Sequence, residues 1–169
     1  MKLNTPPLFT SNENYDISND GKLVAVSAHY RNHEESWSTS LKTFYIDVEK
    51  RKKPFLITSH TDARTQYPVF SNDNTKIAYL AMKIPGLESE ILHFEIYNIL
   101  TNQLTILPNK EELSIQGFIW ESDNKIIFYA NSYQANRLFT LNIKNISSPI
   151  VELYPVKYKN MSYSLPCLS

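Results

Sequence analysis

Short apolar segments alternate with tight polar turns along the whole chain, and one such pattern occurs three times. The copies are YDISNDGKLVAV at 15–26, PVFSNDNTKIAY at 68–79 and FIWESDNKIIFY at 118–129. Their shared aspartates lie at positions 20, 73 and 123, which gives a repeat of about 50 residues. Each copy predicts a strand, a turn whose aspartate accepts backbone N–H groups, and a second strand rich in β-branched and aromatic residues.

Two more strands follow each copy. The third strands are TFYIDV at 43–48, FEIYNI at 94–99 and LFTLNI at 138–143, and the fourth lie near 54–58, 104–107 and 150–153. Four short strands per repeat, without helical periodicity, are typical of β-propeller blades. We therefore predict an all-β partial β-propeller of about three four-stranded antiparallel blades, at 14–58, 67–107 and 116–154. An N-terminal extension at 1–13 and a C-terminal tail at 155–169 flank them.

The second strand of each copy is apolar on both faces. Residues 23–26, 77–81 and 126–130 do not alternate apolar with polar. A sheet packed between two neighbouring blades has this pattern, whereas a β-sandwich or an up-and-down barrel, the lesser alternatives, would alternate more strictly. Propellers have four to eight blades, so three form an incomplete ring. We expect the chain to be part of a longer protein or a truncated gene product. Because both terminal blades are open, we expect the isolated chain to self-associate or to be only marginally folded.

Charge and composition narrow the classes of partner. The chain has 169 residues with 17 basic and 17 acidic side chains, so it lacks the positive excess that nucleic acids and anionic membranes require. Its polar N-terminus has no secretory signal, which predicts a cytoplasmic chain as written, although a parent with a different N-terminus could be secreted. The single cysteine, Cys167, cannot form an internal disulfide.

Several segments in order resemble the N-terminal propeller of prolyl-oligopeptidase-family serine peptidases. They are YDISNDGKLVAV at 15–26, SWST at 36–39, PVFSNDNTKIAYLAMKIPGLESE at 68–90 and FIWESDNKIIFYA at 118–130. The dipeptidyl-peptidase V and acylaminoacyl-peptidase branch is most similar, with its S-P-D-G turn, A-W-S-T segment and A-Y-L-A-M followed by P-G-x-E-S-D. Departures include Asn19 and Asn72 where the family has proline, and Glu90 where it has aspartate. The family's W-D-R segment is absent before the third blade.

The resemblance implies a substrate-gating domain above a catalytic domain that these residues do not contain. Family members cleave peptides on a C-terminal α/β-hydrolase domain, whose nucleophile lies in a G-x-S-x-G elbow. Two positions after the three glycines stand Leu23, Glu88 and Ile119. We therefore expect no catalytic residue and no peptidase activity in this chain alone; its expected partners are short peptides and the missing hydrolase domain. The alternative function is a non-catalytic propeller scaffold that binds proteins.

Glu88 and Glu90 are the candidate site residues. Related exopeptidases hold the free α-amine of a substrate with propeller carboxylates, and a loop between second and third strands suits this contact. A solvated loop or an inter-blade salt bridge is the alternative for both residues. Because such connections leave one end of the blades, we expect Trp37, Glu88 and Glu90 to share the working face.

Other residues that attract attention have ordinary interpretations. His29, His33 and Glu34 resemble part of a zinc motif, but Trp37 stands where a further ligand would be needed. His60 and His93 are isolated in the sequence, and both are expected on the surface or between blades. Trp120 is expected to pack between blades. No metal and no cofactor is predicted.

Overall fold

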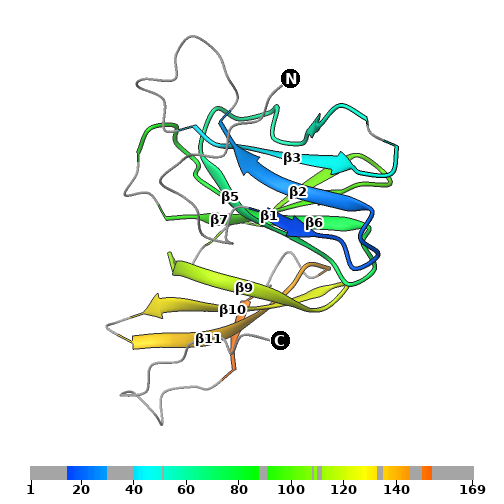
Figure 1. Ribbon diagram of the computed structural model, residues 1–169. Helices are drawn as coiled ribbons and strands as arrows, with labels where there is room; N and C mark the ends of the chain where they lie inside the picture. The colour runs from blue at the N-terminus through cyan, green and yellow to red at the C-terminus, as the bar shows by residue number, and fades with distance from the viewer. Residues whose placement is uncertain are drawn as a thin grey trace.

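Three four-stranded antiparallel sheets follow one another along the chain in the computed structural model (Figure 1). The structure describes residues 15–29, 40–50, 52–87, 91–107, 109, 112–132, 135–144 and 150–153. All regular elements in these ranges are strands, so the predicted all-β fold with three four-stranded blades is confirmed. Within the same ranges there is no helix with the length and apolar character that a membrane crossing needs.

Within each sheet the strands pair in chain order. The first sheet contains β1 (Tyr15–Ile17), β2 (Leu23–Ala28), β3 (Lys42–Asp47) and β4 (Phe55–Leu56). The second contains β5 (Thr65–Phe70), β6 (Lys76–Ala81), β7 (His93–Asn98) and β8 (Gln103–Leu107). The third contains β9 (Ser114–Ser122), β10 (Lys125–Ser132), β11 (Ala135–Asn142) and β12 (Ile150–Glu152). This up-and-down order is the blade topology of a propeller.

The first two copies of the repeat form the same turn. Ser18 Oγ donates to Asp20 Oδ1 at 2.7 Å, and Ser71 Oγ donates to Asp73 Oδ1 at 2.6 Å. Each aspartate also accepts a backbone N–H two residues later, from Lys22 at 3.1 Å and from Thr75 at 3.0 Å. The predicted acceptor role of the aspartate is therefore confirmed in these two turns.

The third copy turns differently. Glu121 occupies the position of the two serines, and the hairpin closes with Ser122 paired to Lys125. Asp123 Oδ1 accepts from the backbone N–H of Asp73 at 2.9 Å, so it connects two blades and has no recorded bond within its own turn. A register shift follows between Lys125 and Ile126. A one-residue shift exchanges the two faces of a strand.

Apolar side chains fill the two spaces between consecutive sheets. Tyr79, Ala81 and Phe70 of the second sheet pack against Ala25 and Ile57 of the first. Between the second and third sheets, a larger cluster contains Ala78, Leu80, Phe94, Ile96, Leu107, Leu113, Ile115, Phe118, Trp120, Ile126, Phe128, Ala130, Phe139 and Leu141. Both faces of β6 are therefore buried, as its uninterrupted apolar sequence predicted.

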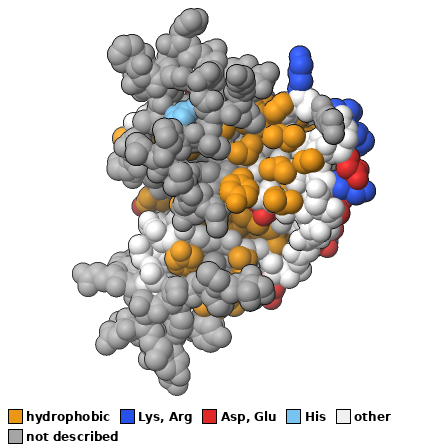
Figure 2. All heavy atoms as spheres, in the orientation of Figure 1, with side chains coloured by type: hydrophobic (Ala, Val, Ile, Leu, Met, Phe, Trp, Pro, Cys, Tyr) orange, Lys and Arg blue, Asp and Glu red, His pale blue; other side chains and the backbone are white. Residues whose placement is uncertain are grey.

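The terminal sheets each carry a second apolar face. On the first sheet Val26, Ala28 and Phe44 form a third cluster, and Figure 2 shows hydrophobic side chains gathered where β1 to β3 lie. On the third sheet, Ile127 and the residues paired with it belong to the face away from the second sheet, and β10 alternates buried with half-buried residues. The second face of this strand is only half-buried because no described sheet covers it, as expected for a terminal blade of an incomplete ring.

The turns after β1, β5 and β9 lie at one end of the blades, which we call the turn end. Asn19 N donates to Asn74 Oδ1 at 2.8 Å, and Asn19 Nδ2 donates to Asn72 O at 3.0 Å. Together with the contact from Asp73 to Asp123, these bonds join all three turns. In Figure 1 this end is on the right, where Figure 2 shows charged side chains along the rim.

Candidate functional site

The opposite end of the blades, which we call the loop end, is where the connections between second and third strands begin and finish. Ala28 pairs with Lys42 in the first sheet, and Ala81 pairs with both Thr65 and His93 in the second. Thr65 N donates to Leu41 O at 2.9 Å, which joins the two sheets at this end. The described ends of both connections therefore lie on the same side of the molecule.

The third blade differs from its neighbours at this end. β10 runs to Ser132 and β11 begins at Ala135, and these two residues are paired. The connection between the second and third strands of this blade is therefore short. Because β10 and β11 stay paired almost to the turn, the longer connections between second and third strands are those of the first two blades.

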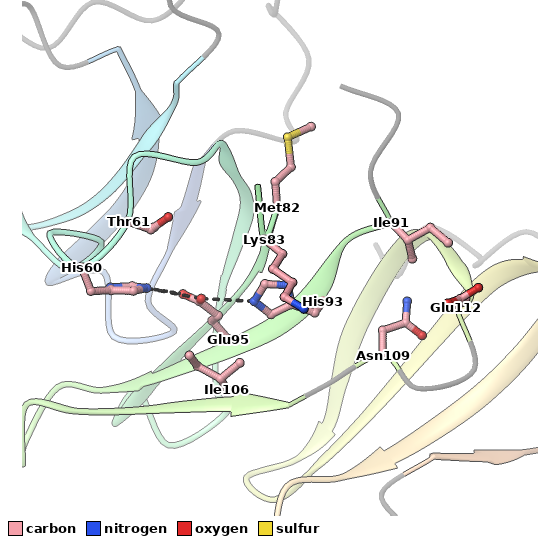
Figure 3. Close-up of a pocket in the computed structure, with 10 residues that line it drawn as sticks. All are labelled: His60, Thr61, Met82, Lys83, Ile91, His93, Glu95, Ile106, Asn109 and Glu112. Atoms are coloured by element: carbon pink, nitrogen blue, oxygen red, sulfur yellow. Dashed lines mark hydrogen bonds and ion pairs between the residues drawn. The ribbon is translucent and has the colours of Figure 1, made fainter. Parts of the chain in front are cut away.

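A cavity of about 710 Å³ opens at the loop end of the second blade. Figure 3 shows its ten lining residues: His60, Thr61, Met82, Lys83, Ile91, His93, Glu95, Ile106, Asn109 and Glu112. They come from the connection between β4 and β5, the ends of β6 to β8, and the segment before β9. The fourth strand of the first blade has only two residues. It is therefore too short to extend across the second sheet at this point.

Glu95 occupies the centre of the polar wall, with one imidazole on each side (Figure 3). His60 Nε2 donates to Glu95 Oε2 at 3.0 Å and lies 3.3 Å from Oε1. His93 Nε2 donates to Oε1 at 3.2 Å. Both imidazoles therefore carry hydrogen on Nε2, and the carboxylate fixes their orientation. Because His60 precedes β5 and Glu95 lies on β7, this contact also connects two parts of the chain 35 residues apart.

The carboxylate of Glu95 is held in its charged form although its side chain is only 4% exposed. Burial acts to raise the pKa of Glu95, but the hydrogen bond from His93, the adjacent Tyr79 hydroxyl and the interaction with His60 together outweigh it and lower the pKa. The Tyr79 hydroxyl lies against this carboxylate without reaching the geometry of a full hydrogen bond. Burial, and then the charge of Glu95, raises the pKa of Tyr79.

The other walls of the cavity are apolar near its mouth. Ile91 and Ile106 are 38% and 51% exposed, whereas Met82 is buried. Lys83 and Glu112 are exposed at the rim. Asn109 has a structural role, because its side-chain amide donates to Leu92 O and Leu113 O and its Oδ1 accepts from Leu113 N. The cavity thus combines a charged floor with an apolar entrance.

The sequence-predicted site residues Glu88 and Glu90 lie outside the described residues, as does Trp37. Their positions relative to the cavity are therefore not described, and their amine-binding role remains a prediction. Lys83 and Ile91, on either side of that segment in the sequence, both line the cavity.

Sequence reasoning missed Glu95 as a site residue. His93 and Glu95 are two residues apart on β7, so they share a face of the strand, and this spacing was a readable signal. The participation of His60 had no such signal, since only the fold brings it to the same face. The prediction that His60 and His93 lie at surfaces or blade interfaces is compatible with their places at the rim of the second blade.

The remaining residues that the sequence singled out either belong to the described part of the chain, as Trp120 does in the core, or lie outside it. Trp120 packs in the core between the second and third sheets, and its Nε1 donates to Val69 O at 3.1 Å, which confirms inter-blade packing. His29 is described, whereas His33 and Glu34 are not. Among the described residues no group of three or more histidine, cysteine, aspartate or glutamate side chains is placed to hold a metal ion.

Comparison with known proteins relates the chain to fungal peptidases. Dipeptidyl-peptidase 5 of Arthroderma otae is 27% identical over 145 residues, which cover 80% of this chain and 20% of that protein. A dipeptidyl-peptidase 5 homologue from Emericella nidulans is 26% identical over 164 residues, 94% of this chain and 22% of its own length. The chain therefore spans about a fifth of the length of these relatives. No family model matches the chain.

Solved structures with the same fold include peptidase propellers. AtxE2 isopeptidase has a TM-score of 0.64 at 10% identity, covering 83% of this chain and 28% of that one. The propeller domain of the trilobed protease from Pyrococcus furiosus has a TM-score of 0.56 at 13% identity, covering 83% and 43%. TolB from Acinetobacter baumannii reaches 0.58 at 15% identity, covering 86% and 33%. The predicted resemblance to peptidase propellers is confirmed, and the chain has the fold of a partial propeller.

Proposed function

We propose that this partial propeller of the prolyl-oligopeptidase type acts as the substrate-gating part of a serine dipeptidyl- or acylaminoacyl-type peptidase. In this role it roofs an active site on a separate α/β-hydrolase domain and admits only short peptides. The blades at 14–58, 67–107 and 116–154 would form part of the roof. The acyl-transfer chemistry would belong entirely to the other domain, because the three glycines of this chain do not form a G-x-S-x-G elbow.

One observation carries the proposal: the similarity to dipeptidyl-peptidase 5 extends over 80% to 94% of the chain. The fold agrees with it, since three consecutive four-stranded sheets are the blades that such a roof requires. The loop end supports it further, because the larger connections and the cavity lie there, and binding residues concentrate on loops that a rigid scaffold holds.

A second candidate function is a non-catalytic propeller scaffold that binds proteins. The similarity of fold to TolB keeps this candidate open, although at 15% identity it concerns the fold alone. The reading frame that follows Ser169 distinguishes the two candidates. Further blades and then a G-x-S-x-G elbow with later aspartate and histidine are expected for the peptidase. Further blades followed by a stop codon, without an elbow, would contradict the gating function and favour the scaffold.

The loop between β6 and β7 is the proposed site of amine recognition. Glu88 and Glu90 would hold the free α-amine of a peptide by charge-assisted hydrogen bonds. What supports this is their place in the sequence, between two residues that line the cavity at the loop end, Lys83 and Ile91.

A further inference from the structure

We propose that the cavity around Glu95 is a subsite for the long basic side chain of a lysine or arginine residue in a short peptide. The inference rests on the proposed function for the source of its ligand, a peptide, but it does not depend on amine binding by Glu88 or Glu90. It concerns described residues only: the charged floor of the cavity, its apolar walls and its polar rim.

The floor carries a negative charge that calls for a cation. Glu95 is nearly fully buried, and all its salt bridges among the described residues are with imidazoles, His60 at 3.0 Å and His93 at 3.2 Å. Among the described residues no lysine or arginine pairs with this carboxylate. An opposite charge stabilises a buried charge, so a permanently charged cation that reaches this floor would be stabilised.

Exposed apolar residues beside the buried carboxylate favour a side chain with an aliphatic stem. Ile106 pairs with Glu95 across β7 and β8 and is half exposed, so it stands beside the carboxylate on the same face of the sheet. Ile91 lies on the other side of the opening, as Figure 3 shows. An aliphatic stem would pack against these two residues while its charged end reaches Glu95, which is how lysine and arginine side chains distribute themselves between apolar and polar surroundings. An α-amine, placed directly on the peptide backbone, has no such stem.

The rim offers contacts for the peptide backbone. Lys83 is exposed there and forms no salt bridge with another described residue, so its ammonium group could bind a carbonyl or carboxylate of the ligand. Glu112, on the segment before β9, adds a second carboxylate near the opening. The site thus has a carboxylate at its floor, and one positive and one negative side chain at its rim.

The test uses two blocked amino acids that differ only at the end of the side chain. N-acetyl-lysine methylamide carries the ammonium group, and N-acetyl-norleucine methylamide has the apolar stem alone. Each is titrated into the whole chain while the imidazole resonances of His60 and His93 are followed by NMR. We expect the lysine compound to shift both and to bind at least about tenfold more tightly than the norleucine compound, since a hydrogen bond between charged groups is stronger than apolar contact of one stem end. N-acetyl-arginine methylamide shows which basic side chain is preferred.

Two variants identify the carboxylate. Glu95→Gln keeps the size of the side chain and removes its charge, and we expect it to reduce lysine affinity about tenfold or more. The control variant Glu49→Gln removes the same charge from an exposed side chain outside the cavity, and it should leave the affinity unchanged. If Glu95→Gln does not fold, the comparison of lysine with norleucine on the unaltered chain still decides. Equal binding of the two compounds, or no shift of either imidazole, would overturn the subsite.

The blocked ligands keep this inference separate from the proposed amine anchor. They have no free α-amine, so a failure of Glu88 or Glu90 to bind amines would leave the result unaffected. Failure of the lysine compound to bind this cavity would not contradict the gating function. If protonated imidazoles already neutralise Glu95, the lysine compound will not bind, and that result would also reject the subsite.

Discussion

The two ends of the blades use polar residues in opposite ways. At the turn end, asparagine and aspartate side chains bond to neighbouring turns, as between Asn19 and Asn74 and between Asp73 and Asp123. At the loop end, Glu95 and two histidines border an open cavity. Polar groups at the first end are satisfied within the protein, while those at the second face space that a ligand can enter. The turn end therefore holds the blades together, and the loop end is free for recognition.

The largest expected effect concerns the core that both ends share. Phe128 is fully buried, 5.3 Å from the ring of Phe94 and 5.3 Å from that of Phe139. Phe128→Ala should lower the free energy of unfolding by about 3–5 kcal/mol, because it removes apolar contacts and leaves a cavity. Denaturant titration measures this. Ile127→Ala, on the half-buried face of the same strand, should cost clearly less, and an equal loss would show that the second face is as tightly packed as the first.

At the turn end, Asp73 and Asp123 provide a matched pair. Hydrogen bonds from Ser71, Thr75 and Lys76 outweigh burial and lower the pKa of Asp73. Asp73→Ala should cost about 1–2 kcal/mol of unfolding free energy, because it removes several of these bonds. Asp123→Ala should cost less, since one recorded bond, from Asp73 N, depends on it. The same denaturant titration ranks the two, and the reverse order would contradict the structural role given to the first two turns.

The loop end should respond to acid through Glu95. Its pKa is lowered in the folded protein, so its charged form contributes stability above the unfolded pKa of about 4.3 and loses it as pH falls through the folded pKa. Unfolding free energy measured from pH 7 to 3 should therefore fall more steeply below about pH 4.3 in the unaltered chain than in Glu95→Gln. Identical pH profiles would mean that the imidazole contacts do not favour the charged carboxylate.

The smallest expected effect is on turnover, in a full-length protein that contains these residues and a hydrolase domain. Glu88→Gln should weaken cleavage of peptides with a free N-terminal amine by roughly tenfold and leave N-blocked peptides nearly unchanged, because only the former present a cation. The ratio of kcat/KM for the two kinds of peptide measures this. Equal losses on both would reject the amine anchor.

The repeat pattern was sufficient to predict the fold. The two Ser-Asn-Asp turns recur with the same hydrogen bonds, because serine and aspartate close such turns locally, without help from distant residues. The consequence of Glu121 was harder to see. Loss of one serine shortens the third turn and shifts the register of β10, so its buried residues are one position away from those the repeat would indicate.

The candidate site was less accessible to sequence reasoning. Glu95 reads as an ordinary polar position in an amphipathic strand, and its significance depends on His60, 35 residues earlier in the chain. That contact follows from the connection between the first and second blades, which no local pattern specifies. The predicted acidic loop, by contrast, was found from a family resemblance, and its role awaits measurement.

The most direct test of the difference between the two ends is a map of where a short peptide binds. The tripeptide Lys-Ala-Ala is titrated into the isotope-labelled chain, and backbone amide shifts are followed at both ends. We expect the largest shifts at the loop end, at Lys83, His93 and Glu95, and no change for Asn19, Asp73 and Asp123 at the turn end. Shifts concentrated on the turn end, or spread evenly over both, would contradict the assignment of recognition to the loop end.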